Sequence, residues 1–312
     1  MRKKRGYVLA GGLALAIVAT SVAFALTSGG DEETPPRQLE LAGAPGPGVG
    51  DEAMLGWAET VLAGQCMVAR DFPFAVAAPE GAEATPQERL AEMYGTTDVA
   101  VARERGYGIG PRFRRPQPQA DDANRRYITA MTPEENRTYS LAYFGDDKDM
   151  VRVEDAATGT VQYSATGCLA DARRYLYGDL QQWASLDTWA LSLDNRAYAT
   201  VTASADYRRR LATWQKCMDR AGVPAQSPAA SRERIAGLVR EQGAEQAETT
   251  AAVAEAGCNG SSGLTSASIT AHRAELDRVL AAEKANYTGY REMRRTALAK
   301  AKSLQSDPYR RP

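Results

Sequence analysis

Residues 169–218 read LADARRYLYGDLQQWASLDTWALSLDNRAYATVTASADYRRRLATWQKCM, and their apolar side chains recur every three to four positions. A first apolar stripe runs from Leu169 to Leu193, and a second helix is expected from near Asp194 to Met218. Such spacing is typical of amphipathic α-helices that bury one face. This stretch therefore predicts a mainly α-helical fold.

The segments on either side of this stretch extend the helical pattern. Thr132-Pro133 followed by Glu135 forms a capping signal, with proline at the first helical position. At about 1.5 Å per residue, the apolar seam of the last segment predicts a long C-terminal helix of nearly 60 Å. The further helices are expected from Asp51 to the proline at 73, and over residues 86–94, 132–144, 231–242, 244–256 and 266–304.

Residues 150–166 are the only convincing strand material in the sequence. Val151 and Val153 alternate with polar residues, Thr158-Gly159 supplies a turn, and Val161 and Tyr163 alternate again. This pattern predicts one small β-hairpin within the helical fold.

The N-terminus has the layout of an export segment. Four basic residues, 2–5, precede a run from Tyr7 to Leu26 without a charged side chain. Ala23-Phe24-Ala25 resembles a signal-peptide cleavage site, yet the apolar run is also long enough to span a bilayer. Residues 1–26 are therefore a signal peptide or an N-terminal membrane anchor. The positive-inside rule places the rest of the chain outside in both cases.

The composition then divides the chain. Residues 27–50, rich in Gly, Pro and acidic side chains, are expected to be a flexible linker, and residues 51–312 a helical ectodomain. A division of the ectodomain into two units, 51–178 and 179–312, is an open alternative to a single one. The first thirty residues hold four basic and no acidic side chains, so the remainder carries −5 within a total of −1. This balance argues against a general nucleic-acid or anionic-membrane binder, so the chain is expected to contact a membrane only through the N-terminal segment, if that segment is not cleaved.

Four cysteines in an exported chain predict two disulfides. A zinc site is the weaker interpretation, because Cys66, Cys168, Cys217 and Cys258 form no C-x-x-C pair and His272 is the only histidine.

A repeated motif suggests how the cysteines pair. Cys66-Met67 and Cys217-Met218 each lie near the end of an apolar-striped helix, with a proline seven residues after each cysteine. Each is followed by a later Gly-Cys, at Cys168 and Cys258. The preferred pairing is therefore Cys66 with Cys168 and Cys217 with Cys258. Three connectivities exist for four cysteines, and the sequence alone does not choose between them.

Several motifs resemble an uncharacterised family of exported or membrane-anchored actinobacterial proteins that have repeated Cys-Met-x-x-x-Gly motifs. The resemblance covers nearly the whole ectodomain and implies no activity, since none is assigned to that family. The chain departs from the family pattern at Asp71, where glycine is usual, and before its last cysteine, where an acidic residue is usual. The motifs are Gly106-Tyr107-Gly108, Asn124 with Tyr127, Gly167-Cys168 with Ala172, Leu176-Tyr177-Gly178, Trp214-x-x-Cys217-Met218 and an Ala-rich helix ending at Cys258.

A basic segment is the best candidate for ligand binding. The stretch 103–126 combines many arginines with Gly and Pro, and this composition predicts an irregular surface loop. Arginine side chains bind phosphate and carboxylate groups bidentately, so an anionic ligand is the expected one. Asp121 and Asp122 offer the alternative of a solvated loop with balanced charge. The candidate residues are Arg103, Arg105, Tyr107, Arg112, Phe113, Arg114 and Arg115.

The sequence offers little support for catalysis or for a cofactor. A Ser-His-Asp or Cys-His site would have to use His272, and the glycines at 106–110 precede Pro111 and belong to no phosphate-binding motif. We expect no metal and no cofactor. The expected function is that of a non-enzymatic envelope protein that binds a partner protein or an anionic wall polymer, through the basic loop or the terminal helix. The alternative is a wall-directed hydrolase with a carboxylate pair.

Overall fold

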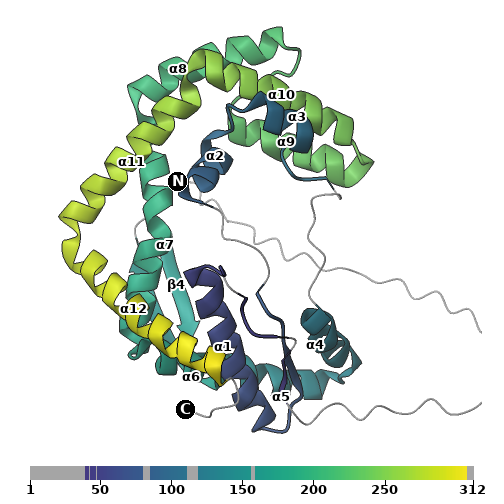
Figure 1. Cartoon of the computed structure of the whole chain (residues 1–312), viewed down its shortest axis with the longest axis vertical. Helices are drawn as coiled ribbons and strands as arrows, with labels where there is room; N and C mark the ends of the chain where they lie inside the picture. The colour runs from purple at the N-terminus through teal and green to yellow at the C-terminus, as the bar shows by residue number, and fades with distance from the viewer. Residues whose placement is uncertain are drawn as a thin grey trace, which may run out of the picture. The chain divides into compact units, whose positions relative to one another are not determined.

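The computed structural model describes residues 39–41, 43–46, 48–79, 85–110, 119–155 and 159–307 (Figure 1). The predicted signal peptide or anchor lies outside this part of the chain. The mainly α-helical class is confirmed. The helices are α1 (Asp51–Val68), α2 (Pro86–Tyr94), α3 (Val99–Arg105), α4 (Gln119–Ala130), α5 (Pro133–Phe144), α6 (Gly167–Tyr177), α7 (Leu180–Ala203), α8 (Ala205–Arg220), α9 (Pro228–Gln242), α10 (Glu245–Ser262), α11 (Leu264–Ala282) and α12 (Lys284–Ser306).

The predicted hairpin is confirmed as β3 (Met150–Asp155) and β4 (Gly159–Ser164), an antiparallel pair in which Val151 lies opposite Tyr163. It packs on α7, where the Tyr163 and Trp183 rings meet edge to face with their centroids 4.8 Å apart. An aromatic pair of this kind stabilises the packing of the hairpin on α7 beyond the apolar area that it buries.

A second, shorter strand pair was not expected. Strand β1 (Leu39–Leu41) pairs in parallel with β2 (Phe74–Val76), and both contact α1. Strand β1 lies inside the segment predicted to be a flexible linker, so ordered structure begins before Asp51.

Two main core clusters contain most of the large buried side chains. One joins α1, α5, α6 and α12 with the β1–β2 pair, and it contains Trp57, Met67 and Leu176. The other joins α2, α7, α8, α10 and α11 around Trp214 and Met218. Figure 1 shows the C-terminal α12 beside α1 and α6, which it contacts. Each cluster draws on both halves of the chain, and the division into units 51–178 and 179–312 stays a prediction.

Both predicted disulfides are present. Cys66–Cys168 joins the end of α1 to the start of α6, with Cα atoms 5.5 Å apart, and Cys217–Cys258 joins α8 to α10, with Cα atoms 5.6 Å apart. The described chain holds no free cysteine. Two such bonds are typical of a protein that folds in an oxidising, extracytoplasmic environment.

Three expected boundaries were wrong. The break between the two central helices lies at Ser204, which caps α8 by accepting a hydrogen bond from the Tyr207 amide at 3.1 Å, and not near Asp194. The C-terminal helical segment divides at Glu283 into α11 and α12, although α12 confirms the long C-terminal helix. The basic segment 103–126 is not irregular throughout, because α3 reaches Arg105 and α4 begins at Gln119.

Each of these differences has a tertiary cause. The Asp194 carboxylate lies 3.0 Å from the ring of His272 on α11 and does not cap a helix. Glu283 accepts hydrogen bonds from Trp189 and Arg196 of α7 at the point where the C-terminal segment divides. Asn124 fastens α4 to β2 by pairing with both the amide and the carbonyl of Ala75. None of these contacts can be inferred from local sequence.

Helices in the described part of the chain are too short or too polar to cross a membrane.

Candidate functional site

The structure describes residues 103–110 and 119–126 of the predicted basic loop. Arg103 and Arg105 are exposed on the last turn of α3, and Arg105 lies 3.9 Å from the carboxylate of its neighbour Glu104. Arg112, Phe113, Arg114 and Arg115 lie outside the described residues. Of the five candidate arginines, the described residues therefore include only Arg103 and Arg105, both on α3.

Tyr107 points inward and does not present its ring to solvent as a ligand-binding residue would. Its hydroxyl donates a hydrogen bond to Glu255 at 2.7 Å, and its backbone amide donates one to Glu248 at 2.9 Å. Burial raises the pKa of both the Tyr107 phenol and the Glu255 carboxyl. The preceding Gly106 has φ +60, and an added Cβ would lie 2.8 Å from Glu248. This motif anchors the loop after α3 to α10.

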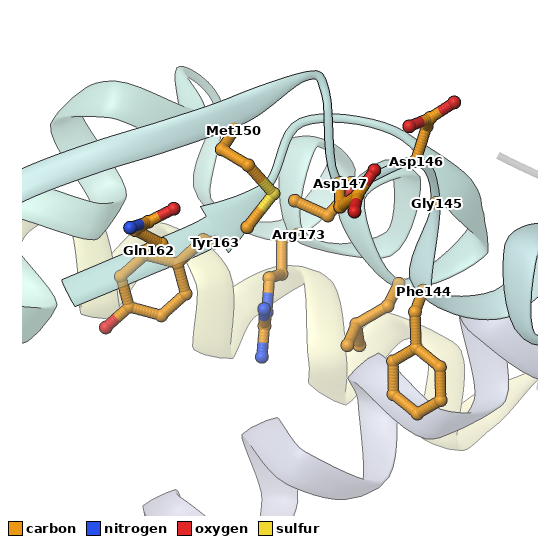
Figure 2. Close-up of a pocket in the computed structure, with 11 residues that line it drawn as sticks. Phe144, Gly145, Asp146, Asp147, Met150, Gln162, Tyr163 and Arg173 are labelled. Carbon is orange, nitrogen blue, oxygen red and sulfur yellow. The ribbon is translucent and has the colours of Figure 1, made fainter. Parts of the chain in front are cut away.

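A cavity of about 310 Å³ lies beside the hairpin (Figure 2). Phe144, Met150 and Tyr163 contribute apolar walls, and Phe144 is 56% exposed at the rim. The guanidinium of Arg173 also belongs to the lining, but its Nε bonds Glu59 at 3.2 Å and its Cζ lies 4.5 Å from the Trp183 ring centroid. The main cation that lines this cavity is thus already engaged.

A larger and more open groove, of about 830 Å³, follows α12 past the start of α1. Its lining combines cations and aromatic rings from one face of α12 with Asp51 of α1. The α12 residues that line it are Tyr287, Thr288, Tyr290, Arg291, Glu292, Arg294, Arg295, Leu298, Ala299 and Lys302.

The charge of α12 sets it apart from the rest of the chain. This helix carries six Lys and Arg side chains and a single acidic one, in a protein whose net charge is −1. Lys300 has a structural role, because its ammonium donates to the carbonyls of Tyr175 and Leu176 at the end of α6. Arg291, Arg295 and Lys302 remain exposed along the groove.

Two arginines of the groove stack on tyrosines four residues earlier. The Cζ atoms of Arg291 and Arg294 each lie 5.6 Å from a ring centroid, of Tyr287 and Tyr290 respectively. Arg294 also bonds the Glu52 carboxylate at 2.7 Å. Stacking on a tyrosine ring fixes the orientation of the guanidinium group in the free protein. Less side-chain entropy is therefore lost when a ligand binds. The groove is therefore suited to phosphate or carboxylate groups.

A carboxylate cluster lies between α1 and α7. Burial is the main cause that raises the pKa of Asp187 to about 6; the negative charges of Glu52 and Glu59 act in the same direction, while Arg173 and Arg294 act against it. The residues that line the groove and the 310 Å³ cavity do not include Asp187 or Glu59. This cluster therefore bears on the pH dependence of stability more directly than on catalysis.

Asp187 should make the fold less stable as the pH rises from about 4 to 6. In this window the folded state holds a proton that the unfolded state has released, since an ordinary aspartate has a pKa near 4. The contribution is present below that window and is lost as the pH passes the folded-state pKa. Urea unfolding at intervals from pH 3.5 to 7.5 should therefore show Asp187→Asn gaining stability relative to wild type across this range. A constant difference between the two curves would contradict the raised pKa.

His272 is fully buried and has no access to a substrate. Its Nδ1 lies 3.0 Å from the Tyr94 hydroxyl, and its Nε2 lies 3.0 Å from an Asp194 carboxylate oxygen. Both ring nitrogens are thus used to join α2, α7 and α11. The ring therefore has a structural role in the packing of these helices.

Sequence reasoning named the terminal helix as a binding element but missed the residues of its groove. Tyr287 and Tyr290 belong to the apolar seam predicted for the last segment, and both also line the groove. An arginine four residues after each tyrosine, at 291 and 294, was the available signal.

Comparison of the chain with models of protein families, with curated proteins and with solved structures finds no match.

Proposed function

We propose that this protein is an extracytoplasmic, non-enzymatic protein of the cell envelope that binds an anionic wall polymer in the groove along α12. The observation that carries the proposal is the row of exposed cations, Arg291, Arg295 and Lys302, beside two arginine–tyrosine stacks. The two disulfides support the extracytoplasmic location.

The length of the groove favours a polymer over a single small anion. From Tyr287 to Lys302 the helix rises by about 22 Å, so the cations can contact several successive charged groups of an extended chain. Guanidinium groups suit both phosphate and carboxylate, and an aromatic ring beside them suits the apolar face of a sugar. The groove is also open along its length, as an extended ligand requires.

The alternative of a wall-directed hydrolase has less support in this geometry. A carboxylate pair would have to face a groove, with one member acting as an acid. The carboxylates that line the α12 groove are Asp51 and Glu292, and Glu292 pairs with Arg295 at 3.3 Å. Binding is therefore the function that the groove supports best.

Reversing three charges in the groove should weaken polymer binding at least about tenfold, which corresponds to about 1.4 kcal/mol. The variant is Arg291→Glu, Arg295→Glu and Lys302→Glu, and all three side chains are exposed, so the fold should be retained. The measurement is the affinity of the full chain for polyphosphate and for polyglucuronate, at low and high salt. Dextran serves as the neutral polymer.

A second triple variant controls for net charge. Arg208→Glu, Arg234→Glu and Arg240→Glu change the charge equally at exposed positions on α8 and α9. It should bind both polymers nearly as wild type does. Equal losses in the two variants would show attraction without a defined site, and failure of the wild type to bind either polymer would overturn the proposal. Crosslinking on intact cells that captures a protein through α12 would favour the partner-protein alternative.

A further inference from the structure

A second cavity, of about 570 Å³, lies apart from the α12 groove. It opens between α2, α7, α9 and the loop that follows α3, and it shares no lining residue with the groove. Its volume lies within the range of small-molecule sites in proteins, which are mostly apolar with a few well-placed polar groups.

Most of the wall is apolar and comes from several elements. Met93 of α2, Tyr198 of α7 and Ile109 of the loop are all half-buried, and Pro228 and Ala236 belong to α9. Because the wall is drawn from segments that are distant in the sequence, its shape depends on the fold as a whole. An apolar body is the part of a ligand that this wall would cover.

One fixed cation lies in the wall. The Cζ of Arg232 lies 5.5 Å from the centroid of the Tyr107 ring, and its Nη1 donates to the Glu92 backbone carbonyl. Tyr107 is itself held by Glu255, at 2.7 Å. The Nε of Arg232 is buried without an acceptor among the described residues. A guanidinium held in this way, with no salt bridge to a described carboxylate, is a ready site for a ligand anion.

Two carboxylates belong to the same cavity. Glu92 and Glu233 both line it and both are exposed, and neither side chain has a hydrogen-bond or ion-pair partner among the residues that the structure describes. They are therefore available for a cationic group of the ligand, while Arg232 accommodates an anionic one. Fatty acids would leave the carboxylates without a counter-ion, and simple amines would leave the arginine without one.

We propose that this cavity binds a short apolar peptide with free termini, of the size of a dipeptide. The ligand carboxylate lies at Arg232, its ammonium group lies at Glu92 and Glu233, and its apolar side chains cover Met93, Ile109 and Tyr198. The site is independent of polymer binding along α12, so either can fail without the other.

A series of four probes tests the three parts of the ligand separately. The full chain is titrated by calorimetry with Leu-Leu, N-acetyl-Leu-Leu, Leu-Leu amide and Gly-Gly. Leu-Leu should bind at one site, and each of the other three should bind at least about tenfold more weakly. Absence of saturable binding by Leu-Leu, or equal binding of Leu-Leu and its acetylated form, would overturn the proposal.

Variants then assign the contacts. Glu233→Gln should weaken Leu-Leu severalfold but leave N-acetyl-Leu-Leu unchanged, because that probe lacks the ammonium group. Ala236→Phe should fill the cavity and abolish binding of every probe, with the circular dichroism spectrum retained. Glu241→Gln, on the exposed face of the same helix, is the matched control and should bind as wild type does. Unchanged binding in Ala236→Phe would place the peptide elsewhere and exclude this cavity.

Discussion

Replacing Cys66 and Cys168 together by alanine is expected to lower the free energy of unfolding by about 4 to 5 kcal/mol. The bond between these residues spans 102 positions, and a crosslink restricts the unfolded chain more as the loop that it closes grows longer. Cys168 is also fully buried in the core cluster around Trp57 and Met67, so its loss removes packing as well. We therefore expect this pair to be the most damaging single crosslink to remove.

The measurement is urea unfolding of the full chain in mild detergent, followed by tryptophan fluorescence. Replacing Cys217 and Cys258 by alanine gives the matched comparison, because that bond spans only 41 positions and should cost about 4 kcal/mol in the same chain-entropy account. The wild type should also lose stability when a reducing agent is added. A Cys66–Cys168 variant with the wild-type midpoint would contradict the expectation.

The disulfide pattern is the feature that sequence reasoning predicted best, and the reason is physical. A helix with an apolar stripe buries that face, so a cysteine near its end has a fixed position beside the core. The chain repeats this arrangement at Cys66 and Cys217. The later Gly-Cys positions supplied matching partners, and the structure confirms both pairs. Local capping chemistry was equally informative, since Thr132 and Glu135 form the expected capping box at the start of α5.

Features that depend on contacts between distant segments were not predictable. Strand β1 has three residues, too few for a period of two to be recognised, and its partner β2 lies beyond α1 in the sequence. Asp194 reads locally as a helix-start residue, yet it bonds to His272 on another helix. Glu283 lies within a helical pattern and bonds Trp189 and Arg196 on another helix.

The candidate site illustrates the same limit. The composition of the segment predicted a ligand-binding loop formed by Tyr107 and the arginines near it. In the structure, the Tyr107 hydroxyl instead donates a hydrogen bond to Glu255. The groove along α12 needed both the spacing of its own side chains and the position of α1 beside it. Only the first of these is present in the sequence.

Gly167→Ala should lower the free energy of unfolding by about 3 kcal/mol or more, because two costs act at this position. Gly167 has φ +87, a conformation that residues with a Cβ rarely adopt. An added Cβ would also lie 2.8 Å from the backbone carbonyl oxygen of Tyr143. Backbone atoms cannot rotate away as a flexible side chain can, so the start of α6 and the end of α5 would have to separate.

Gly257→Ala is the control that the chain itself provides, because both glycines immediately precede a disulfide cysteine. Gly257 lies inside α10, is exposed, and has no atom within 4 Å of an added Cβ. Alanine there should raise stability by up to about 1 kcal/mol, since glycine is the poorer helix former. Urea unfolding of the two variants should therefore move the midpoint in opposite directions. Equal effects would mean that the close approach of Gly167 to the end of α5 does not limit stability. Opposite effects would show that the two Gly-Cys motifs have different structural roles although their sequences are alike. Only at Gly167 does the close approach of another backbone segment require a glycine.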